Sequence, residues 1–295
     1  MDDSKIRQQV REFYNQIGWQ SVSEGMYQNA RYEDLRPVSR GYIHRCHLRV
    51  GQYLKSKGKL MLDAGSGPVQ YQEYLAYSEG FTFRVCVDIS ILALQEARKR
   101  IGERGLYVVA DVSCLPFKAE IFEGEVSLHT LHHLPISDQV CAYKELFRVL
   151  SPGCNAVVVN GWSYSPLMRQ LNWLVVLVER VQTLYSRLRV KRATRSTQIT
   201  LYENDNDSIG IGDQSSAVGT YVQKMDAMTL KDLLKEQLPF EVKVWRSVSV
   251  HFLRTLVHPY LGGRFWLAFL YWLEERFPHY FGEKGQYPLI ILRKD

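Results

Sequence analysis

Cysteine is scarce in this sequence and never paired at close spacing. The cysteines are Cys46, Cys86, Cys114, Cys141 and Cys154. An odd number without a C-x-x-C pair disfavours both a disulfide framework and a zinc knuckle. The sequence therefore predicts a fold held by its hydrophobic core, in a reducing compartment such as the cytoplasm.

Long apolar runs are absent as well. None reaches the roughly 18 residues that predict a transmembrane helix, and the N-terminus, MDDSKIRQQV, has no apolar signal-peptide core. Hydrophobic residues make up 46% of the chain of 295 and charged residues 23%, which suits a globular protein. The net charge of +6 favours anionic partners without choosing among nucleic acid, phospholipid head groups and acidic metabolites.

Short apolar segments alternate with helical segments in the first half of the chain. Such alternation predicts right-handed βαβ units, and apolar strands predict a sheet covered on both faces. We expect an α/β fold: a doubly wound, mostly parallel seven-stranded sheet with helices on both faces, an N-terminal helical lid, and helical insertions after strands five and six. The expected strands are 59–62, 83–87, 106–110, 126–128, 155–159, 240–250 and 286–293.

Four regions are predicted. They are an N-terminal helical lid (1–57), a Rossmann-like cofactor-binding core (58–162), a helical and loop insertion that caps the acceptor (163–228), and a C-terminal helix and strands that complete the sheet (229–295), with a helical insertion at about 255–280. In the last region, Thr229 is expected to open a short helix through a capping box.

The first strand ends in a glycine-rich turn, Asp63-Ala64-Gly65-Ser66-Gly67. Ligands of doubly wound sheets bind beyond the carboxyl ends of the strands. Asp88 ends the second strand, where a carboxylate can receive both ribose hydroxyls, and Asp111 ends the third, near an adenine amino group. A dinucleotide is the alternative ligand, but Gln70 stands where its fingerprint needs a glycine, and Asp63 would repel a pyrophosphate. The charges of S-adenosylmethionine, an ammonium and a sulfonium, suit the turn better.

Five segments in order resemble the Rossmann-fold S-adenosylmethionine-dependent methyltransferases, especially the small-molecule type that includes the quinone-biosynthesis enzymes. The resemblance covers residues 58–162, with Glu123 where the family has an aspartate. The segments are Leu62–Gly67, Val87–Ser90, Ala110–Val112 with Leu115–Phe117, Ser127–Pro135 and Glu145–Gly153.

The resemblance implies S-adenosylmethionine as cofactor and gives roles to its binding residues. Asp63, Gly65 and Gly67 would line the methionine part, and Ala64 and Ser66 would also bind the cofactor. Asp88 would bind the ribose and Ile89 would lie against the adenine, whose edge Asp111 and Val112 would hold. His129 would pass along the cofactor near the reacting methyl.

Histidines follow the predicted fourth strand. His129, His132 and His133 are candidate general bases, because histidine is the usual base near neutral pH. The alternative is that they cap the turn and bind backbone. His44, Cys46 and His47 lie together on a predicted helix, but no second cluster completes four ligands, so we expect them on the helix surface and expect no metal.

The N-terminal region is rich in aromatic residues and arginine. Tyr14, Trp19, Tyr27 and Tyr32 are candidates for a lid over the cofactor, with Arg36 reaching a carboxylate. Packing of an accessory helix pair is the alternative.

Two stretches outside the predicted sheet indicate a lipophilic acceptor. Apolar residues spaced by three and four between Pro166 and Leu188 form a helical stripe that runs into basic residues 187–195, and 265–273 is apolar most of the way round. Both stretches favour an anionic membrane surface as partner and a cytoplasmic protein that is peripheral at the inner membrane face. Alternatively, the stripes pack on each other or across a dimer, since the sequence leaves the oligomeric state open.

The predicted function is methyl transfer to a small, lipid-like acceptor. The alternatives are an RNA or protein methyltransferase, which the basic charge allows, and a binding protein without catalysis. Nucleic acid is disfavoured, because no RNA-binding module is present and no N/D-P-P-Y/F tetrapeptide follows strand four.

Overall fold

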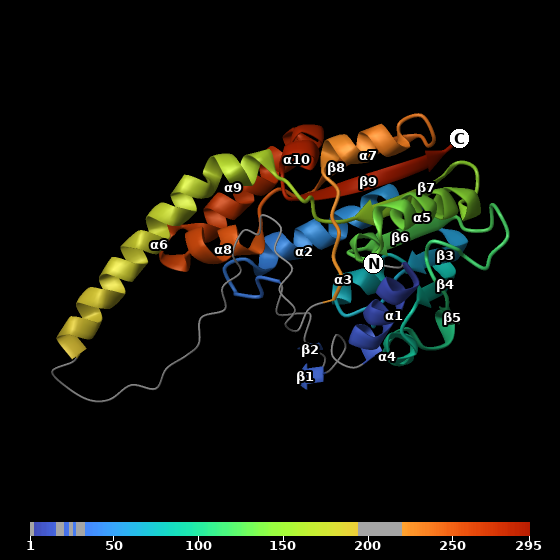
Figure 1. Cartoon of the computed structure of the whole chain (residues 1–295), viewed down its shortest axis with the longest axis horizontal. Coiled ribbons are helices and arrows are strands. Elements are labelled where there is room, and N and C mark those ends of the chain that lie inside the picture. Colours follow the sequence, from blue (N-terminus) through green and yellow to red (C-terminus); the bar gives the residue numbers. More distant parts are fainter. Residues whose placement is uncertain (1–2, 16–20, 24–25, 28–32, 194–219) are drawn as a thin grey trace.

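The structure, a computed structural model, describes residues 3–15, 21–23, 26–27, 33–193 and 220–295 (Figure 1). Seven strands form one sheet in the order β5-β4-β3-β6-β7-β9-β8. Only β9 is antiparallel to its neighbours in that sheet, β7 and β8. The predicted fold class is confirmed. The strands are β3 (Gly58–Ala64), β4 (Phe81–Asp88), β5 (Gly105–Val109), β6 (Gly124–Leu128), β7 (Cys154–Val159), β8 (Phe240–Arg246) and β9 (Tyr287–Lys294).

Helices cover both faces of the sheet. On one face lie α5 (Ile136–Val149) and α7 (Ala227–Leu234), and on the other lie α2 (Arg40–Leu48), α3 (Gln72–Ala76) and α4 (Ile91–Ile101). Short 3-10 helices occur at η3 (Arg49–Tyr53), η4 (Gly102–Arg104), η5 (Leu131–His133) and η6 (Pro259–Leu261).

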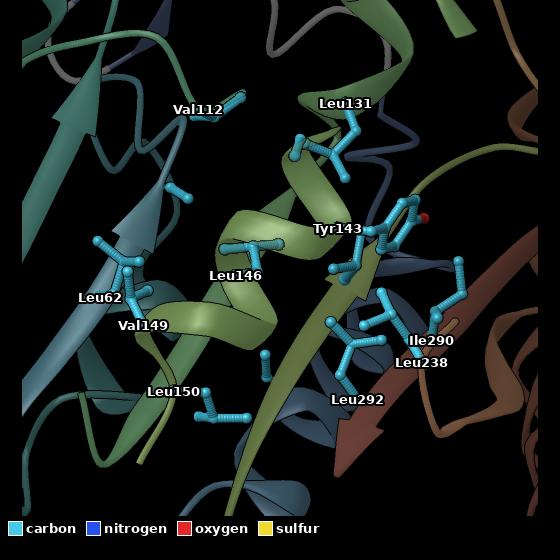
Figure 2. Packing of buried hydrophobic residues seen from close by; sticks show 14 of the residues in the cluster. Leu62, Val112, Leu131, Tyr143, Leu146, Val149, Leu150, Leu238, Ile290 and Leu292 are labelled. Carbon is cyan, nitrogen blue, oxygen red and sulfur yellow. The ribbon is translucent and has the colours of Figure 1, made fainter. Parts of the chain in front are cut away.

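The hydrophobic core consists of two clusters, one on each side of the sheet. Successive strand residues alternate between them: Leu62 packs with α5, and its neighbour Met61 packs with α2 and α4. Figure 2 shows the first cluster, where Tyr143 and Leu146 of α5 lie over the strands. Each buried leucine or isoleucine contributes about 1.5–3 kcal/mol, so the strands need apolar residues on both faces.

The N-terminal region contains a hairpin that the sequence did not predict. After α1 (Asp3–Phe13), the strands β1 (Ser21–Ser23) and β2 (Met26–Tyr27) pair antiparallel. The region predicted as a helical lid therefore also holds a short strand pair between the helices α1 and α2. Cross-strand hydrogen bonds replace helix in a stretch that is rich in serine, a poor helix former in a helix interior.

Helical insertions follow β7 and β8, as predicted. The long helix α6 (Pro166–Ala193) projects from the body, while α8 (Val250–Leu256), α9 (Gly263–Arg276) and α10 (Pro278–Lys284) lie near its base (Figure 1). The expected strand over 240–250 ends at Arg246, because Ser249 caps α8 by accepting a hydrogen bond from the Phe252 N–H at 3.1 Å.

Helix α7 begins before the predicted capping residue. Asp226 is the cap, and its carboxylate accepts the N–H of Thr229 at 2.7 Å. Thr229 therefore lies inside the helix. Aspartate and threonine both cap well, so the sequence offered two starts three residues apart.

The predicted apolar stripe of α6 is only partly buried. Leu167, Leu171 and Leu174 are half-buried, and α6 packs against α8, but Val181 is 57% exposed. The side chains of Tyr185 and Leu188 and the basic run 187–195 lie outside the described residues. No helix within the described ranges is long and apolar enough to cross a membrane.

A carboxyl group lies unpaired inside the sheet. Glu125 of β6 is fully buried, and neither of its oxygens has a hydrogen-bond partner. Burial raises its pKa well above the ordinary value of 4.5, so the group stays protonated in the folded protein while it ionises in the unfolded chain. The folded state then binds more protons, and stability falls as pH rises above 4.5.

We expect Glu125→Gln to remove the loss of stability that the wild type shows as pH rises above 4.5. Between pH 5 and 6 the variant should gain about 1.4 kcal/mol in free energy of unfolding relative to the wild type, measured by urea denaturation. Glu236→Gln, at an exposed position, is the control. Identical pH dependence in Glu125→Gln and wild type would contradict the assignment of a neutral buried carboxyl.

Candidate active site

The glycine turn follows β3 at the carboxyl edge of the sheet. Gly65 has φ 73° and Gly67 has φ 53°, in the left-handed region that favours glycine. The N–H groups of Gly65 and Ser66 both donate to the carbonyl of Val87, at 2.7 and 3.0 Å. A Cβ on Gly65 would lie 2.1 Å from Cγ2 of Thr130. The turn is therefore packed tightly between β4 and the segment after β6.

Asp88 holds the same turn from the end of β4. Its carboxylate accepts the N–H of Gly67 at 2.9 Å and that of Ser90 at 2.8 Å. Burial raises the pKa of Asp88 to about 6, although these backbone donors favour its charged form. Each carboxylate oxygen can accept two hydrogen bonds, so Asp88 can shape the turn and still receive ligand hydroxyls.

Asp63 forms a buried ion pair that the sequence did not predict. Its Oδ2 accepts from Nη2 and Nε of Arg84, at 2.5 and 3.1 Å, and both residues are buried. Asp63 pairs with Cys86 in the sheet register, so Arg84, two residues earlier on β4, lies on the same face. The charge that was expected to attract the cofactor is thus balanced within the protein.

The remaining predicted cofactor residues lie along the same edge. Asp111 follows β5, and its Oδ1 accepts the N–H and the hydroxyl of Ser113, at 2.8 and 2.7 Å. Val112 is buried, and Ile89 is half-buried. The strand order reverses between β3 and β6, which is the place where doubly wound sheets bind their ligands.

The three histidines cluster after β6. His129 has φ 55°, rare for a residue other than glycine and typical of functional sites. Burial lowers the pKa of His129 to about 3, that of His133 to about 4, and that of His132 to well below its usual value. All three rings are therefore neutral near pH 7.

One of these histidines has a fixed tautomer. Nδ1 of His133 lies 2.8 Å from the carbonyl oxygen of Tyr221, which can only accept, so Nδ1 carries the proton. Nε2 then accepts from the hydroxyl of Tyr14, 2.8 Å away. His132 contacts the side-chain oxygen of Asn160 through Nδ1 at 3.3 Å. His133 thus joins the N-terminal region to the site.

Residues 62–158 match a protein family described as a methyltransferase domain. The chain carries a class I S-adenosylmethionine-dependent methyltransferase domain. S-adenosylmethionine is its cofactor, as the resemblance implied.

The curated relatives of this chain differ in the acceptor that their names give. The chain is 28% identical over 160 residues to "Probable tRNA methyltransferase 9B" of Mus musculus, covering 53% of this chain and 34% of that protein. It is 33% identical over 93 residues to malonyl-[acyl-carrier protein] O-methyltransferase of Salmonella typhimurium, covering 32% and 35%. The chain thus spans about a third of the length of these relatives.

Solved structures share the fold over the whole chain. Geranyl diphosphate C-methyltransferase from Streptomyces coelicolor superimposes with a TM-score of 0.54 at 14% identity, covering 98% of both chains. At that identity the likeness shows the fold of the methyltransferase domain and nothing about the acceptor.

We expect Asp88→Ala to weaken S-adenosylmethionine binding to the methyltransferase domain by about 1.5–3 kcal/mol, because a charge-assisted acceptor is lost. Affinity of the wild type should also fall as pH drops through 6, where Asp88 protonates. Isothermal titration calorimetry checks both, with Asp232→Ala on α7 as control. An unchanged affinity in Asp88→Ala would refute the ribose role.

Sequence reasoning missed the residues that the C-terminal strands bring to the site. The Trp245 ring lies 5.0 Å from that of His129 and 5.8 Å from that of Tyr287 (centroid distances). His47 stacks on Trp245 at 5.2 Å. Because β8 runs parallel to β7 and β9 runs antiparallel, the end of β8 and the start of β9 lie at the edge that holds the glycine turn. Their position at strand ends was the available signal.

Of the three residues expected on the surface of α2, one faces solvent and two face the protein interior. His44 is exposed, but Cys46 and His47 are buried. The expectation of a surface cluster is wrong for these two, because α2 turns that side toward the sheet. Within the described ranges, no group of three or more histidine, cysteine or acidic residues could hold a metal.

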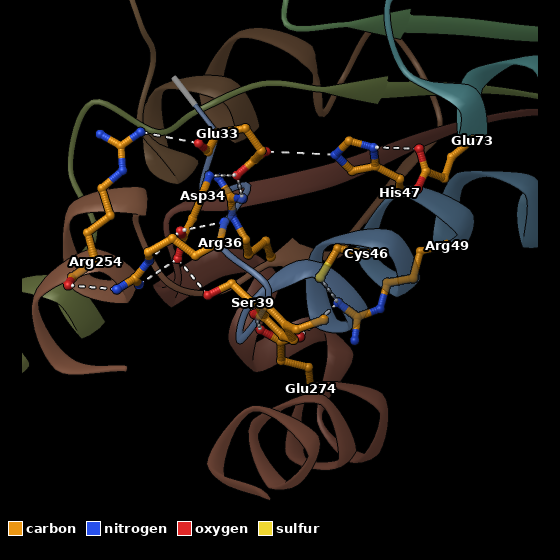
Figure 3. Close-up of polar contacts among 12 residues, drawn as sticks. Glu33, Asp34, Arg36, Ser39, Cys46, His47, Arg49, Glu73, Arg254 and Glu274 are labelled. Atoms are coloured by element: carbon orange, nitrogen blue, oxygen red, sulfur yellow. Dashed lines mark hydrogen bonds and ion pairs between the residues drawn. The ribbon is translucent and has the colours of Figure 1, made fainter. Parts of the chain in front are cut away.

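Arg36 belongs to a polar network at the start of α2 (Figure 3). Its guanidinium binds the Asp34 carboxylate at 2.7 Å and donates to the carbonyl of Leu253 at 2.8 Å. Nearby, Glu33 pairs with the buried Arg246. Arg36 thus reaches a carboxylate of its own chain. Of the other predicted lid residues, Tyr27 lies in β2, and Trp19 and Tyr32 lie outside the described residues.

Proposed function

We propose that this chain is an enzyme that transfers the methyl group of S-adenosylmethionine to a small, lipophilic acceptor. The observation that carries the proposal is the Tyr14–His133 hydrogen bond at the edge that also holds the glycine turn and Asp88. The proposed cofactor-binding groups and the proposed proton acceptor thus share one edge of the sheet.

The reaction needs one displacement and one proton transfer. When bound, S-adenosylmethionine would supply an electrophilic methyl group to the acceptor's nucleophilic atom and would leave as S-adenosylhomocysteine. The proton of the acceptor would pass to the Tyr14 oxygen while the Tyr14 hydroxyl proton moves to Nε2 of His133, which that hydroxyl already contacts. The carbonyl of Tyr221 keeps His133 in that tautomer, so His133 is proposed as the catalytic residue.

The lid is proposed to order over the cofactor through residues 8–36. Two hydrogen bonds from the end of α1 support this. Tyr14 binds His133, and the side-chain oxygen of Asn15 accepts from the hydroxyl of Ser90 at 2.6 Å, directly after Asp88 and Ile89. One turn of chain thus contacts both the acceptor side and the cofactor side of the site, and its closure would exclude water.

The aromatic side chains beside His129 support a lipophilic acceptor. Trp245 and Tyr287 face His129, and Tyr71 lies 4.7 Å from His47, all as ring centroids. Aromatic side chains are typical of sites for apolar ligands, and the charged Arg246 lies over two of these rings, Trp245 and Tyr287. We further propose that the enzyme works in the cytoplasm, as a peripheral protein of the inner membrane face.

A tRNA acceptor is the second candidate, because a relative is named a tRNA methyltransferase. The two are separated by incubating a cell extract with the protein and labelled S-adenosylmethionine, then separating lipid, RNA, protein and small polar fractions. We expect the label in the lipid fraction. Label in the RNA fraction would contradict the lipophilic acceptor and support a nucleic acid acceptor. No label in any fraction would support a binding protein without catalysis.

A further inference from the structure

Helix α9 carries an exposed aromatic face. Phe265, Trp266, Phe269 and Trp272 fall on one side of the helix and are 69%, 59%, 44% and 57% exposed. Their rings gather in pairs, with centroids 5.6 Å apart for Phe265 and Trp266 and 5.8 Å apart for Phe269 and Trp272. We name these four residues the α9 aromatic face. Soluble monomers rarely expose such a patch unless it binds something.

The opposite side of α9 holds the helix to the protein without help from these aromatics. Leu267 is buried in the core cluster under α2, and the buried Glu274 accepts hydrogen bonds from the Tyr42 hydroxyl and from Arg49. The α9 aromatic face is therefore not required by the fold, and substitutions there should leave a folded protein.

Charge indicates which partner fits. Arg264 and Arg276 are exposed at the two ends of α9, and the one exposed acid on the helix, Glu275, is paired with Arg49 at 2.7 Å. Tryptophan beside arginine suits the head-group region of an anionic bilayer. A second copy fits less well, since a two-fold contact through this face would bring like charges of both copies together.

The path of the chain connects this face to the reaction. The segment that holds α8, α9 and α10 leaves the carboxyl end of β8, and α6 leaves the carboxyl end of β7. Both insertions therefore start at the edge that carries the glycine turn and His133. Helix α6 adds a second exposed apolar stripe, formed by Trp173, Leu177, Val181 and Leu184.

We propose that the α9 aromatic face docks the protein on an anionic lipid bilayer, with the catalytic edge turned toward the lipid. This rests on the proposed function and gives its acceptor a source, the bilayer itself. Insertion of the aromatics would supply the affinity, and the arginines would select anionic head groups.

The test is flotation of the full chain with vesicles of phosphatidylcholine, alone or mixed with phosphatidylglycerol. We expect the protein to rise with the mixed vesicles at low salt and to be released as salt screens the arginines. The double variant Trp266→Ser with Phe269→Ser should reduce vesicle binding at least about tenfold. Leu106→Ser with Met228→Ser, exposed apolar residues on β5 and α7, is the matched control and should float like the wild type.

Three results would overturn the docking proposal: no flotation with the mixed vesicles, equal flotation of the double variant, or a wild-type dimer that the double variant converts to a monomer. Light scattering on the same samples shows the last. Calorimetry with S-adenosylmethionine on each sample distinguishes the two proposals. Cofactor binding without flotation would refute only the membrane docking. Flotation without cofactor binding would refute the proposed methyltransferase function.

Discussion

Replacing His133 with alanine is expected to lower kcat about 10²- to 10⁴-fold, the usual contribution of a positioned general base. Nε2 of His133 is the proton acceptor that Tyr14 contacts at 2.8 Å. Affinity for S-adenosylmethionine should stay within about twofold of the wild type, because His133 is proposed to act on the acceptor and not on the cofactor. The measurement is methyl transfer into the labelled acceptor fraction, with calorimetry of the cofactor alongside.

Two further variants sharpen this prediction. Tyr14→Phe removes one hydroxyl and keeps the ring, so it should lower kcat in the same direction. His279→Ala, at an exposed histidine on α10, should leave kcat unchanged. Equal activity of His133→Ala and the wild type would show that alignment alone supplies the rate.

The pH profile separates the roles of Asp88 and His133. Burial lowers the pKa of His133 to about 4 and raises that of Asp88 to about 6. At saturating cofactor, kcat should therefore stay level from pH 7 to 5, while kcat/KM for S-adenosylmethionine falls below pH 6.

Asp63→Asn is expected to destabilise the fold by about 3–5 kcal/mol, because it leaves the buried charge of Arg84 without its partner. Arg84 also donates to the carbonyl of Tyr74 at 2.5 Å, so it cannot turn toward water without breaking that contact. Urea denaturation gives the free energy of unfolding.

The double variant Asp63→Leu with Arg84→Met is the matched comparison. Apolar replacement of a whole buried ion pair is often neutral, so this variant should recover most of the loss. If the single and the double variant are equally destabilised, the ion pair is not the reason for the effect.

The sheet could be predicted because each strand leaves a local pattern. Apolar segments such as 83–87 end in a turn residue, and their alternation with helices fixes the parallel order. The strand over 240–250 was predicted too long because alternation continues past Arg246, while the helix that begins there depends on the single hydroxyl of Ser249. At residues 247–250 the alternating pattern favours a strand, while the capping hydroxyl of Ser249 favours a helix.

The site could be predicted only where its residues follow strands directly. Asp88 and Asp111 are candidates of this kind, and the structure places both after strands at the carboxyl edge of the sheet. The Asp63–Arg84 pair depends on the register of β3 with β4, and Tyr14 meets His133 across 119 residues of sequence. Trp245 and Tyr287 reach the site through strand order. None of these contacts can be predicted from nearby residues, although Trp245 and Tyr287 lie at predictable strand ends.

Binding of S-adenosylmethionine to the purified chain tests the central claim most directly. Isothermal titration calorimetry should show one site with micromolar affinity, about −8 kcal/mol. The same protein should give no heat with NAD, because Gln70 replaces the glycine that a dinucleotide needs. Tight binding of NAD with no response to S-adenosylmethionine would contradict the account.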